Sequence, residues 1–266
     1  MMYRVGVVLV TLALLSAVVG PIVAPHDPAE QELARRLERP SLDHPFGLDE
    51  LGRDIFSRVL AGARISLFVG LTVVGISSVV GVLLGSIAGY FGGWLDDVIS
   101  RTIDVLLAFP GILLAIALVA VLGPSLLNVV MALSVIGWVG YARLVRGQVL
   151  KARELEFVQA ARALGASTSR ILLRHVVPTT MPAVMVQATL GMAGAILAEA
   201  SLSFLGLGVQ PPTPSWGTML NGGRLHLLDA PHLTVFPGAA IAALVLGFNF
   251  LGDGLRDALD PKRYRA

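Results

Sequence analysis

The feature that most constrains this chain is a series of long stretches that contain no charged side chain. They cover residues 5–25, 65–95, 105–142, 176–198 and 233–252. A helix that crosses a bilayer needs about 20 apolar residues, so each stretch is long enough to span a membrane. Charged residues make up only 14% of the chain, whereas a soluble domain holds about 25%. The sequence therefore predicts an all-α polytopic membrane protein.

The third stretch is too long for one span, and Gly123-Pro124-Ser125 provides a natural break within it. Splitting it there predicts six transmembrane helices. They cover residues 1–25 and about 65–89, 104–122, 126–146, 180–203 and 233–252. The remaining parts are an extracytoplasmic segment with an interfacial helix at 26–62, a permease core at 63–253 that contains the last five spans, and a cytoplasmic tail at 254–266.

The distribution of basic residues predicts the orientation of these spans. Seven lysines and arginines lie between Arg143 and Arg174, and four more lie in the tail. Cytoplasmic loops carry an excess of such residues, which favours a chain with both termini in the cytoplasm. The first apolar stretch follows Arg4 but is longer than the core of a signal peptide, and no small-x-small cleavage site ends it. We expect a retained first helix.

Several kinds of chemistry are excluded or disfavoured by what the chain lacks. It has no cysteine, which rules out disulfides and thiolate nucleophiles. His226 and His232, with Asp229 between them, share no helix face, so we expect no metal site. No G-x-x-x-x-G-K-[ST] motif occurs, so the chain is not expected to bind ATP or Mg²⁺ itself. We expect no cofactor in this chain and no enzymatic activity.

Residues 150–178 form a basic, alanine-rich segment between the fourth and fifth predicted spans. Its sequence predicts a helix over 154–164, a left-handed residue at Gly165, and a second helix that begins near Ser167 or Ser169 and runs to Val177. Pro178 then marks the start of the fifth span. A DNA-binding helix–turn–helix is disfavoured because spans on both sides leave no helix free to enter a groove. A helix pair lying on anionic lipid remains an alternative to a docking element for a cytoplasmic protein.

Three segments resemble one known family. "QAARALG" at 159–165, with Pro178 thirteen residues after the glycine, resembles the EAA loop of ATP-binding-cassette (ABC) importer permeases. "HPFGLDELGRDIFSRVLAGARISL" at 44–67 and "EASLSFLGLGVQPPTPSWGTML" at 199–220 resemble the dipeptide/oligopeptide/nickel branch, and within it the shorter, C-type membrane subunit. The resemblance covers residues 3–263. Gln159 departs from the glutamate that is usual at its position, which puts in doubt a salt bridge to an arginine on the ATPase.

The resemblance implies a type I ABC importer permease fold in a bacterial cytoplasmic (inner) membrane. In that family the EAA loop forms a coupling helix that sits in a groove of the ATPase. The corresponding residues here are Gln159, Ala160, Ala161, Ala163, Leu164, Gly165 and Pro178. The implied partners are a second, homologous permease subunit, one or two P-loop ATPase subunits that bind ATP and Mg²⁺, and an extracytoplasmic substrate-binding protein. Peptides are the first expected cargo, with nickel or glutathione as alternatives.

Two polar residues within the predicted spans are candidates for the translocation path. Glu199 lies near the outer end of the fifth span, and Asn249 lies in the sixth. An ionisable residue within a membrane is a functional hypothesis by default. Glu199 could instead be a packing residue held by hydrogen bonds. If it carried protons, the chain would be an ATP-independent channel or an ion-coupled carrier.

The second predicted span carries glycines at positions 81, 85, 89 and 93, which share one helix face. Small residues at this spacing let two helices approach closely in lipid. We expect this face to pack against a neighbouring helix.

Overall fold

The computed structural model describes residues 2–259, and within them the regular structure is helical. The helices are α1 (Met2–Val23), α2 (Ile55–Phe91), α3 (Gly93–Leu107), α4 (Gly111–Leu122), α5 (Leu126–Ala152), α6 (Glu156–Ala163), α7 (Thr168–Ile171), α8 (Val177–Phe204), α9 (Trp216–Gly223) and α10 (His232–Leu259). Two short 3-10 turns cover Leu33–Arg35 and Arg224–His226, and a π turn covers Leu172–Val176.

Five helices are long and apolar enough to cross a membrane, namely α1, α2, α5, α8 with the α7 segment, and α10. The pair α3–α4 gives a sixth if it is counted as one bent span. The prediction of an all-α polytopic protein is confirmed. The predicted break at residues 123–125 is also confirmed, because α4 ends at Leu122 and α5 begins at Leu126.

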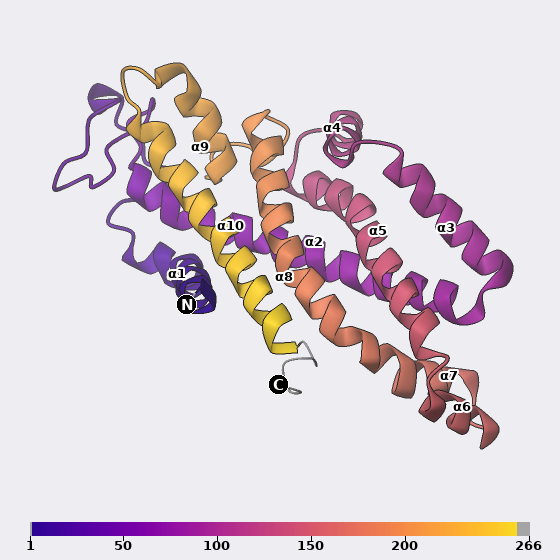
Figure 1. Cartoon of the computed structure of the whole chain (residues 1–266). Helices are drawn as coiled ribbons and strands as arrows, with labels where there is room; N and C mark the ends of the chain where they lie inside the picture. Colours follow the sequence, from indigo (N-terminus) through magenta and orange to yellow (C-terminus); the bar gives the residue numbers. More distant parts are fainter. Residues whose placement is uncertain (1, 260–266) are drawn as a thin grey trace.

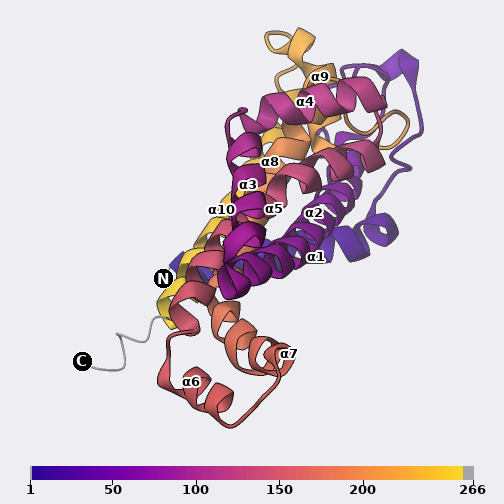
Figure 2. The ribbon, with the colours of Figure 1, turned by 90° about the vertical axis from the view of Figure 1, so that its right-hand side faces the viewer.

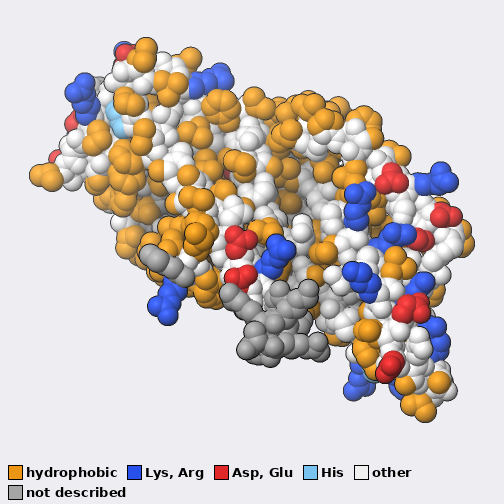
Figure 3. All heavy atoms as spheres, viewed as in Figure 1, with side chains coloured by type: hydrophobic (Ala, Val, Ile, Leu, Met, Phe, Trp, Pro, Cys, Tyr) orange, Lys and Arg blue, Asp and Glu red, His pale blue; other side chains and the backbone are white. Residues whose placement is uncertain are grey.

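The long helices form one bundle in which α2 is the central element. Helices α5, α8 and α10 run in front of α2 (Figure 1), and α2 packs against α1, α5 and α8. Segment 26–54, α9 and the start of α10 gather at one end of the bundle, where a Cβ on Gly47 would touch His232. The opposite end holds both termini of the described chain, and there Gly254 packs against Tyr3. Figure 3 shows charged side chains concentrated towards the ends, with a largely hydrophobic surface between them.

Helices α2 and α5 are in direct backbone contact along a seam of glycines. A Cβ on Gly85 would collide with the carbonyl oxygen of Ala142, and one on Gly89 would lie 2.8 Å from the carbonyl oxygen of Arg146. Close backbone approach of this kind is what small residues permit in a membrane. The predicted packing face is therefore confirmed for positions 81, 85 and 89. Gly93 is the exception, since it begins α3 with a positive φ of 57°.

The start of α2 corrects the prediction of a separate interfacial helix in segment 26–62. The carboxylate of Asp54 accepts a hydrogen bond from the backbone N–H of Ser57 at 2.7 Å and caps the helix. The helix then continues without a break from Ile55 to Phe91. Arg58 is buried and lies 3.5 Å from the carboxylate of Asp49. The charge in the first turn of α2 is therefore covered by segment 26–54.

The predicted single span at 104–122 is wrong. Helix α3 ends at Leu107, α4 begins at Gly111, and the two axes differ by 86°. Proline removes a backbone donor and disfavours helical geometry at the residue before it, so Pro110 keeps Phe109 out of the helix and separates α3 from α4. Counting uncharged residues could not reveal this bend.

The C-terminal boundary also differs from the prediction. Helix α10 continues to Leu259, so residues 254–259 of the predicted tail belong to the last helix. The rest of the predicted tail, 260–266, lies outside the described residues. Likewise α5 extends six residues beyond the predicted end at 146.

Candidate functional site

Residues 153–176, which we call the hairpin, connect α5 to α8. The hairpin consists of α6, a short loop, α7 and the π turn, and it projects from the end of the bundle opposite α9 (Figures 1 and 2). Its first residue follows α5 directly, and its last residue leads directly into α8. A force on the hairpin would therefore act on two long helices of the bundle.

The hairpin has a small core of its own that joins the core of the bundle. Val158, Ile171 and Val176 are almost fully buried and belong to the same hydrophobic cluster as Val149 of α5. Buried aliphatic contacts of this kind hold the two arms at a fixed angle. The hairpin is thus attached to the bundle as a packed element.

The turn of the hairpin has the predicted conformation. Gly165 has a φ of +77°, and its backbone N–H donates to the carbonyl oxygen of Arg162 at 3.0 Å. A left-handed glycine after the last turn is the usual end of a helix. This confirms the geometry expected for Gly165, whereas its part in coupling stays a prediction.

The hairpin exposes most of the residues that carry the resemblance to the EAA loop. Ala161 is half-buried, and the exposed ones are Gln159, Ala160, Ala163, Leu164 and Gly165. Pro178, just beyond the hairpin in α8, is exposed as well. Leu164 is 87% exposed, and Leu155 and Phe157 also show about half of their surface. Grouped apolar side chains on a protein surface are typical of an interaction site. The small alanines between them would let a partner approach the backbone.

Two arginines of the hairpin bind the end of α2. Arg153 donates to the carbonyl oxygen of Gly89 at 3.1 Å. Arg162 places its guanidinium carbon 5.8 Å from the centre of the Tyr90 ring, within the range of a cation–π contact. These two arginines therefore hold the hairpin to the bundle. Arg170 and Arg174 are exposed and stay available to a partner.

Gln159 makes a local contact that its position in the sequence did not reveal. Its side-chain amide donates to the carbonyl oxygen of Glu154 at 3.2 Å, just before the start of α6. A glutamate has no donor for this bond. The substitution that distinguishes this chain from the usual motif thus tightens the first turn of the hairpin.

The second arm of the hairpin is continuous with α8, which corrects the prediction that Pro178 marks a boundary. Helix α7 passes through the π turn into α8, and Pro178 occupies the first turn of α8. A π turn widens the helix by one residue, and such turns accommodate interruptions of the α-helical hydrogen-bond ladder. The loss of one donor at Pro178 therefore does not end the helix.

Glu199 is completely buried between α2, α8 and α9. Its carboxylate accepts hydrogen bonds from Ser203 at 2.7 Å and from Ser66 of α2 at 3.4 Å. Its side chain has 0% exposure, and it does not line the membrane cavity of the next paragraph. This arrangement is that of a packing residue. Asn249 is half-buried on α10 and does not line that cavity either, so the assignment of both residues to the path stays a prediction.

A cavity of about 270 Å³ lies between α2, α4, α5 and α8. We call it the membrane cavity. Ser77, Tyr141 and Gln187 contribute its polar side chains, and the rest of its wall is aliphatic or glycine. One feature of the sequence could have pointed to this site, since Gln187 is a strongly polar residue within an uncharged span.

Comparison with known proteins identifies the family. A family model described as "Binding-protein-dependent transport system inner membrane component" matches residues 81–265. The chain belongs to this family. The dipeptide transport system permease protein DppC of Alkalihalophilus pseudofirmus is 49% identical over 258 residues, which are 97% of this chain and 85% of that protein. The glutathione transport system permease protein GsiD of Escherichia coli is 51% identical over 254 residues, or 95% and 84%.

The fold has a counterpart among solved structures. An inward facing conformation of the MetNI methionine ABC transporter matches with a TM-score of 0.61 at 18% identity, over 76% of this chain and 96% of that chain. This match concerns the fold, whereas the family model and the two relatives confirm the resemblance to a C-type ABC importer permease. The permease is a multi-pass subunit of the inner membrane that works with ATPase and binding-protein subunits, and it is not itself an enzyme. Its orientation in the membrane stays a prediction.

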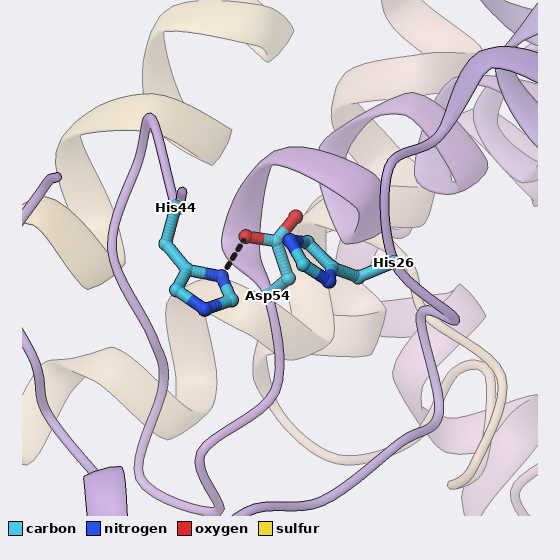
Figure 4. Close-up of side chains that lie close together, drawn as sticks. All are labelled: His26, His44 and Asp54. Atoms are coloured by element: carbon cyan, nitrogen blue, oxygen red, sulfur yellow. Dashed lines mark hydrogen bonds and ion pairs between the residues drawn. The ribbon is translucent and has the colours of Figure 1, made fainter. Parts of the chain in front are cut away.

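Three side chains of kinds that can bind a metal ion, His26, His44 and Asp54, lie close together outside the bundle (Figure 4). His44 Nδ1 donates to Asp54 Oδ1 at 3.0 Å, and the two imidazoles stack with ring centres 4.4 Å apart. One ligand atom from each residue lies within 4.8 Å of the others, but these atoms already make hydrogen bonds, since His44 Nδ1 binds Asp54 and His26 Nε2 lies 3.1 Å from the carbonyl oxygen of Asp43. The group therefore serves as a support for the carboxylate that caps α2.

Proposed function

We propose that this permease is one of two homologous but non-identical membrane subunits and forms half of an ATP-driven import path for peptides. Relatives named for dipeptide and glutathione transport support this cargo, because both are small compounds with amide bonds. Nickel is the alternative that the branch resemblance leaves open.

The observation that carries the proposal is the construction of the hairpin. It presents a face of alanines and exposed leucines, and its second arm runs into α8 without a break. An ATPase that binds this face and moves on ATP binding would tilt α8 directly. The transport step is then alternating access, in which ATP draws two hairpins together, the bundle opens outward, and hydrolysis resets it.

ATP and Mg²⁺ belong to one or two kinds of partner ATPase in this proposal, since the chain has no phosphate-binding loop. The binding protein would dock at the opposite end, on segment 26–54 and α9. Trp216, at the start of α9, is buried and donates to the carbonyl oxygen of Val59 at 2.9 Å. It fixes α9 onto α2 and so gives that end a firm surface.

A cross-linking experiment tests the docking face. The chain has no natural cysteine, so Ala163→Cys introduces one thiol at the exposed end of α6. In the intact complex it should form a cross-link to an ATPase subunit with a bifunctional thiol reagent. Leu42→Cys, on a fully exposed residue of segment 26–54, is the control and should not. A cross-link from position 42 but not from position 163 would refute the proposal.

A pair of glycine variants tests coupling separately from folding. Gly165→Val and Gly206→Val both force a β-branched residue into positive φ, at +77° and +81°, and neither new Cβ meets an atom within 4 Å. Each should cost about 1–2 kcal/mol of strain. Only Gly165→Val should leave ATP hydrolysis without transport, because Gly206 lies at the other end of α8. Equal transport in both variants would remove the hairpin as the coupling element.

A further inference from the structure

Three neutral polar side chains meet in the membrane cavity from three different helices. Ser77 comes from α2, Tyr141 from α5 and Gln187 from α8. Since α7 and α8 form one continuous helix from Thr168 to Phe204, the residue nearest to a helix end is Tyr141, eleven residues before Ala152, which is about 16 Å along the helix. Polar groups at such depth are costly in a membrane and mark functional positions.

Glycines make the room for these polar groups. A Cβ on Gly137 would collide with the hydroxyl oxygen of Ser77, and one on Gly191 with the hydroxyl oxygen of Tyr141. The hydroxyl of Ser77 is buried and has no hydrogen-bond partner among the described residues. An unpaired buried hydroxyl is unfavourable unless a ligand or water satisfies it. The cavity therefore has the construction of a binding site.

The cavity has an open side at Gly194. This glycine lines the cavity, and a Cβ placed on it would meet no atom within 4 Å. A passing molecule could reach the polar groups from this side. The second permease subunit of the proposed function would complete the wall.

The chemistry of the lining restricts what the cavity can hold. Among the described residues that line it there is no acid, base, histidine or methionine. Divalent transition metals need imidazole, thiolate, thioether or carboxylate ligands, which this wall does not offer. Gln187 provides both a donor and an acceptor, and so does the unpaired hydroxyl of Ser77. The hydroxyl of Tyr141 donates to the backbone carbonyl oxygen of Gln187 at 3.4 Å and so offers an acceptor. Peptide amides require that combination.

We propose that Ser77, Tyr141 and Gln187 form a neutral hydrogen-bonding site for the amide groups of a peptide that crosses the membrane. The inference rests on the proposed function and assigns this chain's part of the path to the membrane cavity instead of to Glu199 and Asn249. An amide that leaves water without a partner loses a few kcal/mol. Hydrogen bonds to three neutral groups offset part of this desolvation free energy without holding the peptide tightly. Because the wall carries no charge, it accepts peptides whose side chains differ in charge.

Filling the open side tests the site. Gly194→Leu should abolish uptake of alanylalanine by proteoliposomes that contain the complete complex and its binding protein. The matched control is Gly75→Leu, which also places its side chain in free space but does not line the cavity. The control should transport as the parent does. Normal transport by Gly194→Leu would overturn the proposal.

Thiol labelling gives a second measurement, which reports access to the cavity directly and does not rely on a loss of transport. Ser77→Cys, in a complex whose partner chains have been made free of cysteine, should react with a small hydrophilic methanethiosulfonate. Alanylalanine should slow that reaction severalfold. Ser134→Cys is the control, since Ser134 is also buried and unpaired but does not line the cavity; it should not react.

The outcomes distinguish the possible occupants of the cavity. If Ser77→Cys reacts only with an apolar reagent, lipid fills the cavity. If it does not react at all in the complex, the second permease subunit fills it. If the parent complex transports the dipeptide, either result would overturn the proposal of a peptide site but not the proposed function. A parent complex that transports no peptide would instead refute the proposed function.

Discussion

Arg146 of α5 binds both carboxylate oxygens of Asp96 of α3, at 2.5 and 2.7 Å. The two residues are 50 positions apart in the sequence. They join the first turn of α3 to the C-terminal part of α5. A second ion pair between these helices, Arg143 with Asp104, is longer at 3.5 Å and largely exposed. Because exposed pairs contribute little, the first pair holds α3 more firmly than the second, beside the apolar contact of Ile103 with α5.

Asp96→Asn should loosen α3. The amide retains one acceptor but loses the charge and the two-point contact with Arg146. We expect a loss of about 1 kcal/mol in stability, since both partners are partly exposed. Thermal unfolding of the purified permease in detergent measures this, with the exposed neighbour Asp97→Asn as the control. Equal melting temperatures for the two variants would show that the pair does not hold α3.

Gly85→Ala should separate α2 from α5. The added methyl group would collide with the carbonyl oxygen of Ala142, which is backbone and cannot rotate away. We expect a loss of at least about 2 kcal/mol, visible as a lower melting temperature and a lower yield of folded permease. Gly75→Ala, on the same helix with no atom within 4 Å of its new Cβ, should change neither. A tolerated Gly85→Ala would contradict the close packing of the seam.

The sequence was a sufficient guide to features that follow from local composition. Long uncharged runs predicted the membrane helices, the four-residue glycine spacing predicted the face of α2 that meets α5, and Gly165 predicted the turn of the hairpin. Each of these follows from a rule about one segment, such as the length of a span or the conformational freedom of glycine.

Features that depend on contacts between distant segments could not be predicted. Arg58 is buried beside Asp49 in the first turn of an uninterrupted α2, and α7 continues into α8 through a π turn that absorbs Pro178. The site shows the same limit. Glu199 drew attention because it is charged, although two serines enclose it, while Gln187 faces the membrane cavity and was not singled out.

His44→Ala should weaken the start of α2. His44 holds the carboxylate of Asp54 through one oxygen while the other oxygen accepts from the N–H of Ser57 (Figure 4). A hydrogen bond to a charged group contributes about 1.5–3 kcal/mol, so the melting temperature should fall. Because the ring nitrogens of His44 and His26 are engaged by Asp54 and by the carbonyl oxygen of Asp43, EDTA or added Zn²⁺ should leave the melting temperature of the parent permease unchanged. A chelator that destabilised the parent but not the variant would show that the group binds a metal.

Glu199→Gln and Glu199→Leu together decide what the buried carboxyl does. As a packing residue, Glu199 needs only acceptors for the hydroxyls of Ser66 and Ser203, and glutamine still provides one. Glu199→Gln should therefore assemble and transport at close to the parent rate. Leucine provides no acceptor and leaves two buried hydroxyls unpaired, at a cost of about 1–3 kcal/mol each, so Glu199→Leu should lower the yield of folded permease.

Uptake and ATP hydrolysis are measured in proteoliposomes with and without a proton gradient. If Glu199 carried protons in an ATP-independent carrier, Glu199→Gln would abolish uptake, and uptake by the parent would follow the gradient in the absence of ATP.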